Sequence, residues 1–172
     1  MMHQPTRRQF LASAAFAGAT DAQQDRTTVI FEGRSPNKLC CDTTLRELSD
    51  GSWVMVMLGG GDKEPMPEND LFLSRSKDQG RTWSPMEPVR LGIKEAHPQR
   101  ALVPTELSVY RNECWLYFAN HDGRFTDWTA WVTKSRDGCK TWSKPEPVHP
   151  KIHKATFMRN MIVRRRSGEL VT

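Results

Sequence analysis

The sequence contains two closely similar stretches, SKDQGRTWS at residues 76–84 and SRDGCKTWS at residues 135–143. The second stretch begins 59 residues after the first, and Glu-Pro-Val follows both at the same offset, at 87–89 and 146–148. A match of this length at one offset is not a chance event, and a fixed period indicates repeated structural units. We therefore expect a repeat architecture.

Strand-forming residues occur in the same order around each stretch. Each unit has four predicted strands, at 43–48, 52–58, 71–76 and 83–91 in the first unit and at 105–110, 114–119, 128–135 and 142–148 in the second. Asp50-Gly51 separates the first two strands, and Asp-Gly between β-prone runs is typical of a hairpin. A third unit is expected near residue 158, with two strands around 166–168. Four antiparallel strands form the blade of a β-propeller, so we predict an all-β, incomplete propeller of about two and a half blades.

The repeated pattern Ser-x-Asp-x-Gly-x-Thr-Trp resembles the Asp-box of sialidases and of other bacterial-neuraminidase-repeat proteins. The first copy matches every defined position, and the second departs only at Cys139, where the family has Gly. The resemblance implies a propeller of sialidase type over residues 39–172. In a turn of this kind the Asp carboxylate accepts backbone hydrogen bonds, Gly supplies a positive φ, and Trp packs back between strands. We expect a structural role for Ser76, Asp78, Gly80, Thr82, Trp83, Ser135, Asp137, Thr141 and Trp142.

Sialidase-like propellers close a ring of about six blades. Because the roughly 150 residues that follow the N-terminal signal described below hold about two and a half blades of 59 residues, we expect the chain to be the N-terminal part of a longer propeller. An open blade edge is a site for pairing with another chain, so self-association is expected.

The N-terminus resembles a twin-arginine export signal. Arg7 and Arg8 precede a short apolar segment rich in Ala, at 10–19, which is too short to span a bilayer. We expect residues 1–22 to be the signal, residues 23–38 an N-terminal segment, and the mature protein to be periplasmic or secreted, with no membrane span. A basic N-terminus without a targeting role is the alternative.

Charge and metal-ligand spacing limit the other partners. The formal net charge is +5, and the basic residues are scattered except at 164–166, which argues against a nucleic-acid partner. The histidines lack metal-ligand spacing and no Cys-x-x-Cys occurs, so we expect no metal and no other cofactor. Calcium at Asp62 or Asp122 stays open as an alternative.

The strand order predicts which residues share the upper rim, defined as the starts of the innermost strands and the loops between the second and third strands. Asp42, Pro104 and Arg159 begin the innermost strands of the three units. We predict catalytic roles for Asp62, as an acid, and for Arg159, which would grip an anionic sugar. Asp42, Glu106, Asp122 and Asn160 are predicted to bind substrate. Ordinary solvation of surface residues is the alternative for each.

The family resemblance implies a further set of roles at this rim: three arginines that grip the substrate carboxylate, an Asp acid/base, and a Tyr nucleophile activated by a Glu. This sequence departs from that pattern. The family's first arginine belongs to an aromatic-Arg-Ile-Pro motif, and the matching stretch LCCDTTL at 39–45 has no arginine. The Tyr belongs to a late blade, which the chain lacks.

These observations favour an exported, sialidase-like protein that acts on a glycan or glycoconjugate, as a fragment of a glycoside hydrolase. The isolated chain is expected to be inactive. The alternatives are a non-catalytic propeller that binds carbohydrate or protein and a purely structural scaffold, because a fold alone does not establish a function.

The cysteine in the second Asp-box is the last feature of note. Cys139 stands where a positive φ is expected, and Cys114 opens the second strand of the same unit, so both should lie at the lower end of the blade. We predict a disulfide between Cys114 and Cys139, with two free thiols as the alternative. Cys40 and Cys41 are expected to stay unpaired.

Overall fold

The computed structural model describes residues 27–35 and 37–149, together with the backbone of 163–164 and 170–171. Its first four strands are β1 (Cys40–Glu47), β2 (Trp53–Gly59), β3 (Asp70–Ser76) and β4 (Glu87–Pro88). A short helix, α1 (Ile93–Ala96), leads to β5 (Ala101–Tyr110), β6 (Glu113–His121), β7 (Thr129–Ser135) and β8 (Glu146–Pro147). The hairpin of β9 (Val163–Arg164) and β10 (Leu170–Val171) follows.

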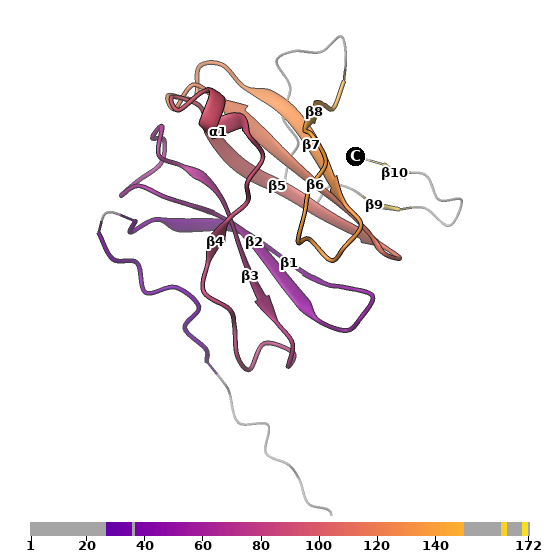
Figure 1. Cartoon of the computed structure of the whole chain (residues 1–172). Coiled ribbons are helices and arrows are strands. Elements are labelled where there is room, and N and C mark those ends of the chain that lie inside the picture. Colours follow the sequence, from indigo (N-terminus) through magenta and orange to yellow (C-terminus); the bar gives the residue numbers. More distant parts are fainter. Residues whose placement is uncertain (1–26, 36, 150–162, 165–169, 172) are drawn as a thin grey trace, which may run out of the picture.

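The strands form two antiparallel sheets in simple up-and-down order, β1-β2-β3-β4 and β5-β6-β7-β8. Figure 1 shows the first sheet in purple and magenta and the second in pink and orange, with the innermost strands β1 and β5 at neighbouring positions. Each sheet has the strand order of a propeller blade. The prediction of an all-β, incomplete propeller is therefore confirmed, with two blades described in full and a hairpin of the next unit. Among the described residues, no helix is long and apolar enough to cross a membrane.

The fourth strand of each blade is shorter than predicted. Both β4 and β8 contain only two residues. Proline lacks a backbone N–H and cannot donate to a ladder, and Pro85, Pro88, Pro145 and Pro147 fall in these segments. Isolated backbone hydrogen bonds on either side of the short strand join it to its neighbour. In the first blade they run from Ser84 N to Arg75 O and from Val89 N to Leu71 O, both 2.8 Å.

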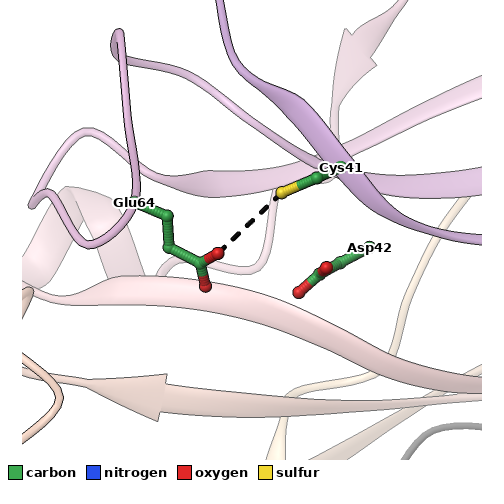
Figure 2. Close-up of side chains that lie close together, drawn as sticks. All are labelled: Cys41, Asp42 and Glu64. Carbon is green, nitrogen blue, oxygen red and sulfur yellow. Dashed lines mark hydrogen bonds between the residues drawn. The ribbon is translucent and has the colours of Figure 1, made fainter.

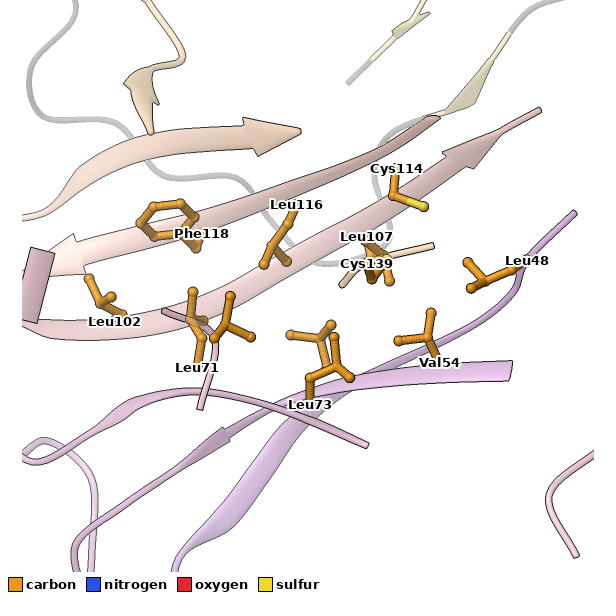
Figure 3. Close-up of a cluster of buried hydrophobic side chains, with 12 residues drawn as sticks. Leu48, Val54, Leu71, Leu73, Leu102, Leu107, Cys114, Leu116, Phe118 and Cys139 are labelled. Carbon is orange, nitrogen blue, oxygen red and sulfur yellow. The ribbon is translucent and has the colours of Figure 1, made fainter. Parts of the chain in front are cut away.

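The core lies between the two blades. Alternate residues of β2 and β3, including Val54, Leu71 and Leu73, face Leu107, Leu116 and Phe118 of the second blade, and all six are at most 1% exposed (Figure 3). Burying each such side chain contributes about 1.5–3 kcal/mol. The two blades are therefore joined by one continuous apolar layer.

Both innermost strands contain a bulge near their first residues. The register shifts between Cys41 and Thr44 in β1 and between Pro104 and Glu106 in β5. Asp42 has a positive φ of 54° within the first bulge. Bulges bend a strand and re-aim its side chains, so these irregularities decide what the upper rim presents.

Candidate functional site

The two Asp-box turns lie at the lower end of the blades. Asp78 accepts hydrogen bonds from the hydroxyls of Ser76 (2.8 Å) and Thr82 (2.6 Å) and from the Thr82 amide (2.8 Å). The indole of Trp83 donates to Gly80 O at 3.0 Å, and Gly80 has a φ of 86°. The hydrogen bonds from Thr82 and Ser76 lower the pKa of Asp78 to about 2. A carboxylate whose oxygens are all used inside a turn acts as a structural acceptor.

The second turn repeats this network with one substitution. Asp137 accepts from the hydroxyls of Ser135 (2.8 Å) and Thr141 (2.6 Å), and the bonds from Thr141 hold its pKa well below the usual range. Cys139 occupies the place of Gly80 with a φ of 64°, and its amide donates to Ser135 Oγ at 2.9 Å. Its side chain packs in the core between the blades, which offsets the backbone strain.

Cys139 and Cys114 are neighbours in this core. The adjacent Cys114 thiol and burial raise the pKa of Cys139. Both cysteines are free thiols in this structure, as are Cys40 and Cys41. The side chains are thus adjacent as expected, whereas the disulfide itself is not formed here and stays a prediction.

The upper rim carries a compact group of acidic and thiol side chains. Cys41, Asp42 and Glu64 each place one side-chain donor atom within 4.8 Å of the others. The Cys41 thiol donates to Glu64 Oε2 at 3.9 Å (Figure 2). Consecutive strand residues normally point to opposite faces, and the bulge in β1 is what turns Cys41 and Asp42 toward the same carboxylate. We call these three residues the rim cluster.

The loop that carries Glu64 is held from inside by Asn69. This residue is fully buried, and its amide donates to Gly60 O (2.8 Å) and Lys63 O (3.0 Å) while accepting from Met66 N (2.8 Å). A side chain at Gly60 would collide with Glu68 O at 2.3 Å, so only glycine fits there. The loop is therefore a fixed support for Glu64.

A stack of aromatic rings from the second blade lies at the same rim. The ring centroids of His121 and Trp128 are 4.5 Å apart, and those of Phe125 and Trp128 are 5.1 Å apart with an interplanar angle of 7°. Trp128 and Cys41 pack against one small cluster of Leu58, Val103 and Ala119, so the stack and the rim cluster are neighbours. Phe125 is the exposed member of this group, with 40% of its surface accessible, and its ring centroid is also 5.0 Å from that of His121.

His121 is the buried base of this stack. Its Nδ1 accepts from Gly123 N at 3.0 Å, and burial lowers its pKa, so the ring is neutral near pH 7 with its proton on Nε2. Nε2 is buried and has no partner among the described residues. His121 therefore supports the stack from inside, and its Nε2–H donor has no acceptor among the described residues.

The predicted site residues are distributed unevenly over this geometry. Asp42 lies in the rim cluster. Asp62 is exposed on the same loop, two residues before Glu64. The loop residue that belongs to the rim cluster is Glu64 and not Asp62. Arg159 and Asn160 lie outside the described residues, and the predicted roles of all these residues stay predictions.

Glu106 and Asp122 have structural partners in this structure. The Glu106 side chain is 2% exposed and pairs with Arg46, while its second oxygen has no partner among the described residues. Asp122 accepts from the amides of Arg124 (2.9 Å) and Thr126 (3.2 Å) and from the Thr126 hydroxyl. These hydrogen bonds hold the pKa of Asp122 well below its usual range, and the bond from the Thr126 hydroxyl has the largest effect. Asp122 thereby shapes the turn that presents Phe125, and substrate binding by either carboxylate stays a prediction.

The sequence interpretation placed Glu64 at the rim without assigning it a role, and it did not predict the aromatic stack. The side chains of Glu64 and Phe125 lie in loops, where no strand periodicity marks the direction of a side chain. A usable signal was present in the second loop, where His121, Phe125 and Trp128 follow one another at short spacing.

The rim cluster has a donor set that could hold a metal. A thiolate and two carboxylates are ligand types that Zn²⁺ accepts, and three protein ligands leave a position open for water or substrate. The hydrogen bond from Cys41 to Glu64 also accounts for the geometry without an ion. We therefore treat the cluster primarily as a pair of carboxyl groups beside a thiol.

No protein-family model matches the chain, and no curated protein is significantly similar to it in sequence. Solved structures of sialidases have a similar fold. The Hadza microbial sialidase Hz136 is 18% identical, with a TM-score of 0.55 over 64% of this chain and 26% of that chain. Trypanosoma rangeli sialidase, in complex with 2,3-difluorosialic acid as a covalent intermediate, is 14% identical, with a TM-score of 0.50 over 66% of this chain and 21% of that chain. The chain thus has a sialidase-like fold and spans about a quarter of the length of these sialidases.

Proposed function

We propose that this chain supplies two blades of an exported, glycan-acting protein, and that the whole protein is a glycoside hydrolase of sialidase-like fold. The observation that carries the proposal is the meeting of Asp42 and Glu64 with a partly exposed aromatic stack at one rim. Carboxylates accept hydrogen bonds from sugar hydroxyls, and an aromatic ring packs against the apolar face of a sugar. The rim therefore offers both kinds of contact that a sugar needs.

The carboxyl pair also suits the chemistry. Glycoside hydrolysis commonly uses two carboxyl groups, about 5 Å apart when the configuration is retained. The nearest carboxylate oxygens of Asp42 and Glu64 lie no more than 4.8 Å apart, so the pair is not too widely spaced for a retaining mechanism. In this proposal Glu64 and Asp42 divide the acid/base role and the nucleophile role between them. Asp62 on the same loop and Arg159 in the third unit remain further candidates for the acid and for the grip on an anionic sugar.

A non-catalytic carbohydrate-binding propeller is the second candidate. It is favoured by the stretch at 39–45, which carries Cys41 and Asp42 where the resemblance leads one to expect an arginine. Binding without hydrolysis would need only the stack and hydrogen-bonding groups at the rim.

Glycan binding by the full chain tests what both candidates share. We expect a glycan array to give binding, and Phe125→Ala to weaken it about tenfold, since the aromatic contact contributes about 0.5–1.5 kcal/mol beyond its buried area. Tyr110→Ala is the matched control, because Tyr110 is 41% exposed at the other end of β5. Absence of binding, or equal loss in both variants, would contradict the proposal.

Hydrolysis separates the two candidates. The isolated chain is expected not to turn over fluorogenic glycosides, since it holds part of the ring. A longer chain that includes the following blades should turn them over, and Glu64→Gln in that chain should lower kcat while glycan binding is retained. Binding without turnover in the longer chain would favour the non-catalytic propeller.

Export is the remaining part of the proposal, and it rests on the pattern at Arg7 and Arg8. Changing both arginines to Lys should keep the protein in the cytoplasm of a bacterial host, because paired arginines are the defining element of such signals. Arg164→Lys with Arg165→Lys is the control, since it alters a second arginine pair outside the leader. Unchanged delivery of the leader variant to the periplasm would show that the pair has no targeting role.

A further inference from the structure

A concave surface lies at the end of the blades opposite the rim. It is a cleft of about 920 Å³, bounded by the two Asp-box turns and by the β1–β2 and β5–β6 turns. This volume is in the range of ligand-binding clefts. We call it the lower cleft.

The lower cleft is lined by an excess of cationic side chains. The six cations are Arg75, Lys77, Arg81, Arg111, Arg136 and Lys140. The lining also contains three carboxylates, Asp50, Asp78 and Asp137, and each of these accepts hydrogen bonds within its own turn. The carboxylates are held in the turns, so the side chains that are free to meet a ligand are mainly positive.

The cations occur at equivalent places in the two repeats. Lys77 and Arg136 each follow the Asp-box Ser, and Arg81 and Lys140 each precede the Asp-box Thr. Neighbouring blades therefore present the same two cationic positions side by side. Such a repeated arrangement suits a ligand whose negative charges also repeat.

Three of these six cations are available to a ligand, whereas Arg136 pairs with Glu113 at 3.0 Å. Lys77, Arg81 and Lys140 are exposed and take part in no ion pair with another described residue. Arg75 is different, because it pairs with Glu87, donates to Cys139 O across the cleft and keeps a buried Nε without a partner among the described residues. Arg75 braces the two blades at the floor, while the exposed cations surround the opening.

We propose that the lower cleft binds an acidic polysaccharide, a chain of sugars bearing sulfate or carboxylate groups. The cations meet the acidic groups, while Ser49, Gln79 and Asn112 in the lining can hydrogen-bond to hydroxyls. Among the described residues, the lining contains no aromatic side chain on which the bases of a single-stranded nucleic acid could stack. A polysaccharide therefore fits better than a single-stranded nucleic acid. The cleft is at the opposite end of the strands from the rim cluster, so this inference does not depend on the proposed function.

The test uses the full chain and a size-defined heparin octasaccharide as the probe. Lys77→Gln, Arg81→Gln and Lys140→Gln are combined in one variant. The control combines Lys63→Gln, Arg124→Gln and Lys144→Gln, which removes the same charge from exposed residues outside the lower cleft. Circular dichroism checks that both variants fold like the parent chain. All six substitutions are at exposed side chains, so both variants should have the circular dichroism spectrum of the parent chain.

We expect the cleft variant to bind heparin about tenfold more weakly and the control to change less than about twofold, since only clustered cations add up in one contact. The slope of log Kd against the logarithm of the salt concentration should be smaller by about two in the cleft variant than in the parent chain. Equal weakening in both variants would overturn the proposal, because it would show attraction by overall charge. Tighter binding of duplex DNA with the same dependence on the three cations would also overturn it and assign the cleft to nucleic acid. Binding of a neutral glycan at the rim should be unchanged in the cleft variant, which separates this result from the test of the proposed function.

Discussion

At the scale of single residues, the Asp-box carboxylates link the stability of the fold to pH. Hydrogen bonds lower the pKa of Asp78 to about 2 and that of Asp137 well below its usual range. The pKa of an Asp in the unfolded chain is about 4. A folded-state pKa below the unfolded one stabilises the fold above the unfolded pKa, and the contribution is lost as the pH falls through the folded pKa.

We therefore predict that the free energy of unfolding declines as the pH falls from about 4 to about 2. Asp78→Asn should reduce this slope, because it removes one of the carboxylates whose pKa is lowered in the folded protein, a group that also includes Asp137 and Asp122. Glu95→Gln is the control, since Glu95 is an exposed carboxylate outside both turns. Urea unfolding at a series of acid pH values measures the slope, and an unchanged slope in Asp78→Asn would contradict the assignment.

Cys139 shows how one side chain can replace a glycine at a positive φ. The strain of its left-handed backbone is offset by burial of its thiol against Cys114. We predict that mild oxidation forms a disulfide between them, leaving two titratable thiols in the denatured protein where the reduced protein has four. A closed loop of about 25 residues should raise the free energy of unfolding by about 3 kcal/mol.

Thiol titration and urea unfolding before and after oxidation check this prediction. Cys114→Ser is the control, because its oxidation should leave stability unchanged. Four free thiols after oxidation of the parent chain would show that the two side chains do not reach bonding geometry.

At the scale of elements, local patterns were sufficient for the strands and turns but not for the rim. The hairpins at Gly51 and the two Asp-box turns follow from short motifs whose backbone geometry is intrinsic to their residues. The short fourth strands could have been expected from Pro85 and Pro88, since each removes a donor.

The composition of the rim cluster could not be predicted in this way. Whether Asp42 faces Glu64 depends on a bulge, and a shift of one residue reverses the direction of every side chain in a strand. Glu64 itself is positioned by Asn69, whose role depends on burial between a loop and a strand. Side-chain positions that are set by contacts between distant segments leave no periodic pattern in the sequence.

The loop that carries Glu64 gives a prediction at this scale. Asn69→Ala should lower the free energy of unfolding by about 1–3 kcal/mol, because the backbone groups of Gly60, Lys63 and Met66 lose their buried partner. Glycan binding at the rim should weaken as well. Asn112→Ala is the control, since that exposed side chain accepts one hydrogen bond, from the Ser49 hydroxyl, within the described part of the chain. A loss no larger than that of the control would show that the loop is held by other contacts.

At the scale of the whole molecule, each blade needs a partner on both of its faces. Val54, Leu71 and Leu73 of the first blade are covered by the second blade. The alternate residues on the opposite face include Met55, Phe72 and Leu45, which pairs directly with Met55 across the strands. Leu45 is 41% exposed, and Met55 and Phe72 are half-buried. We call this surface the outer face of the first blade.

We predict that the 172-residue chain self-associates through this outer face, because contact between copies removes apolar surface from water in the same way that the second blade does on the covered side. Size-exclusion chromatography with light scattering should show oligomers that grow with concentration. Leu45→Lys combined with Met55→Lys should shift the chain toward the monomer, since two charges would have to be buried on association. Val29→Lys is the matched control, because Val29 is 71% exposed but lies outside the sheet. A parent chain that stays monomeric at every concentration, or an equal shift in the control, would show that the outer face is not what copies of this chain recognise.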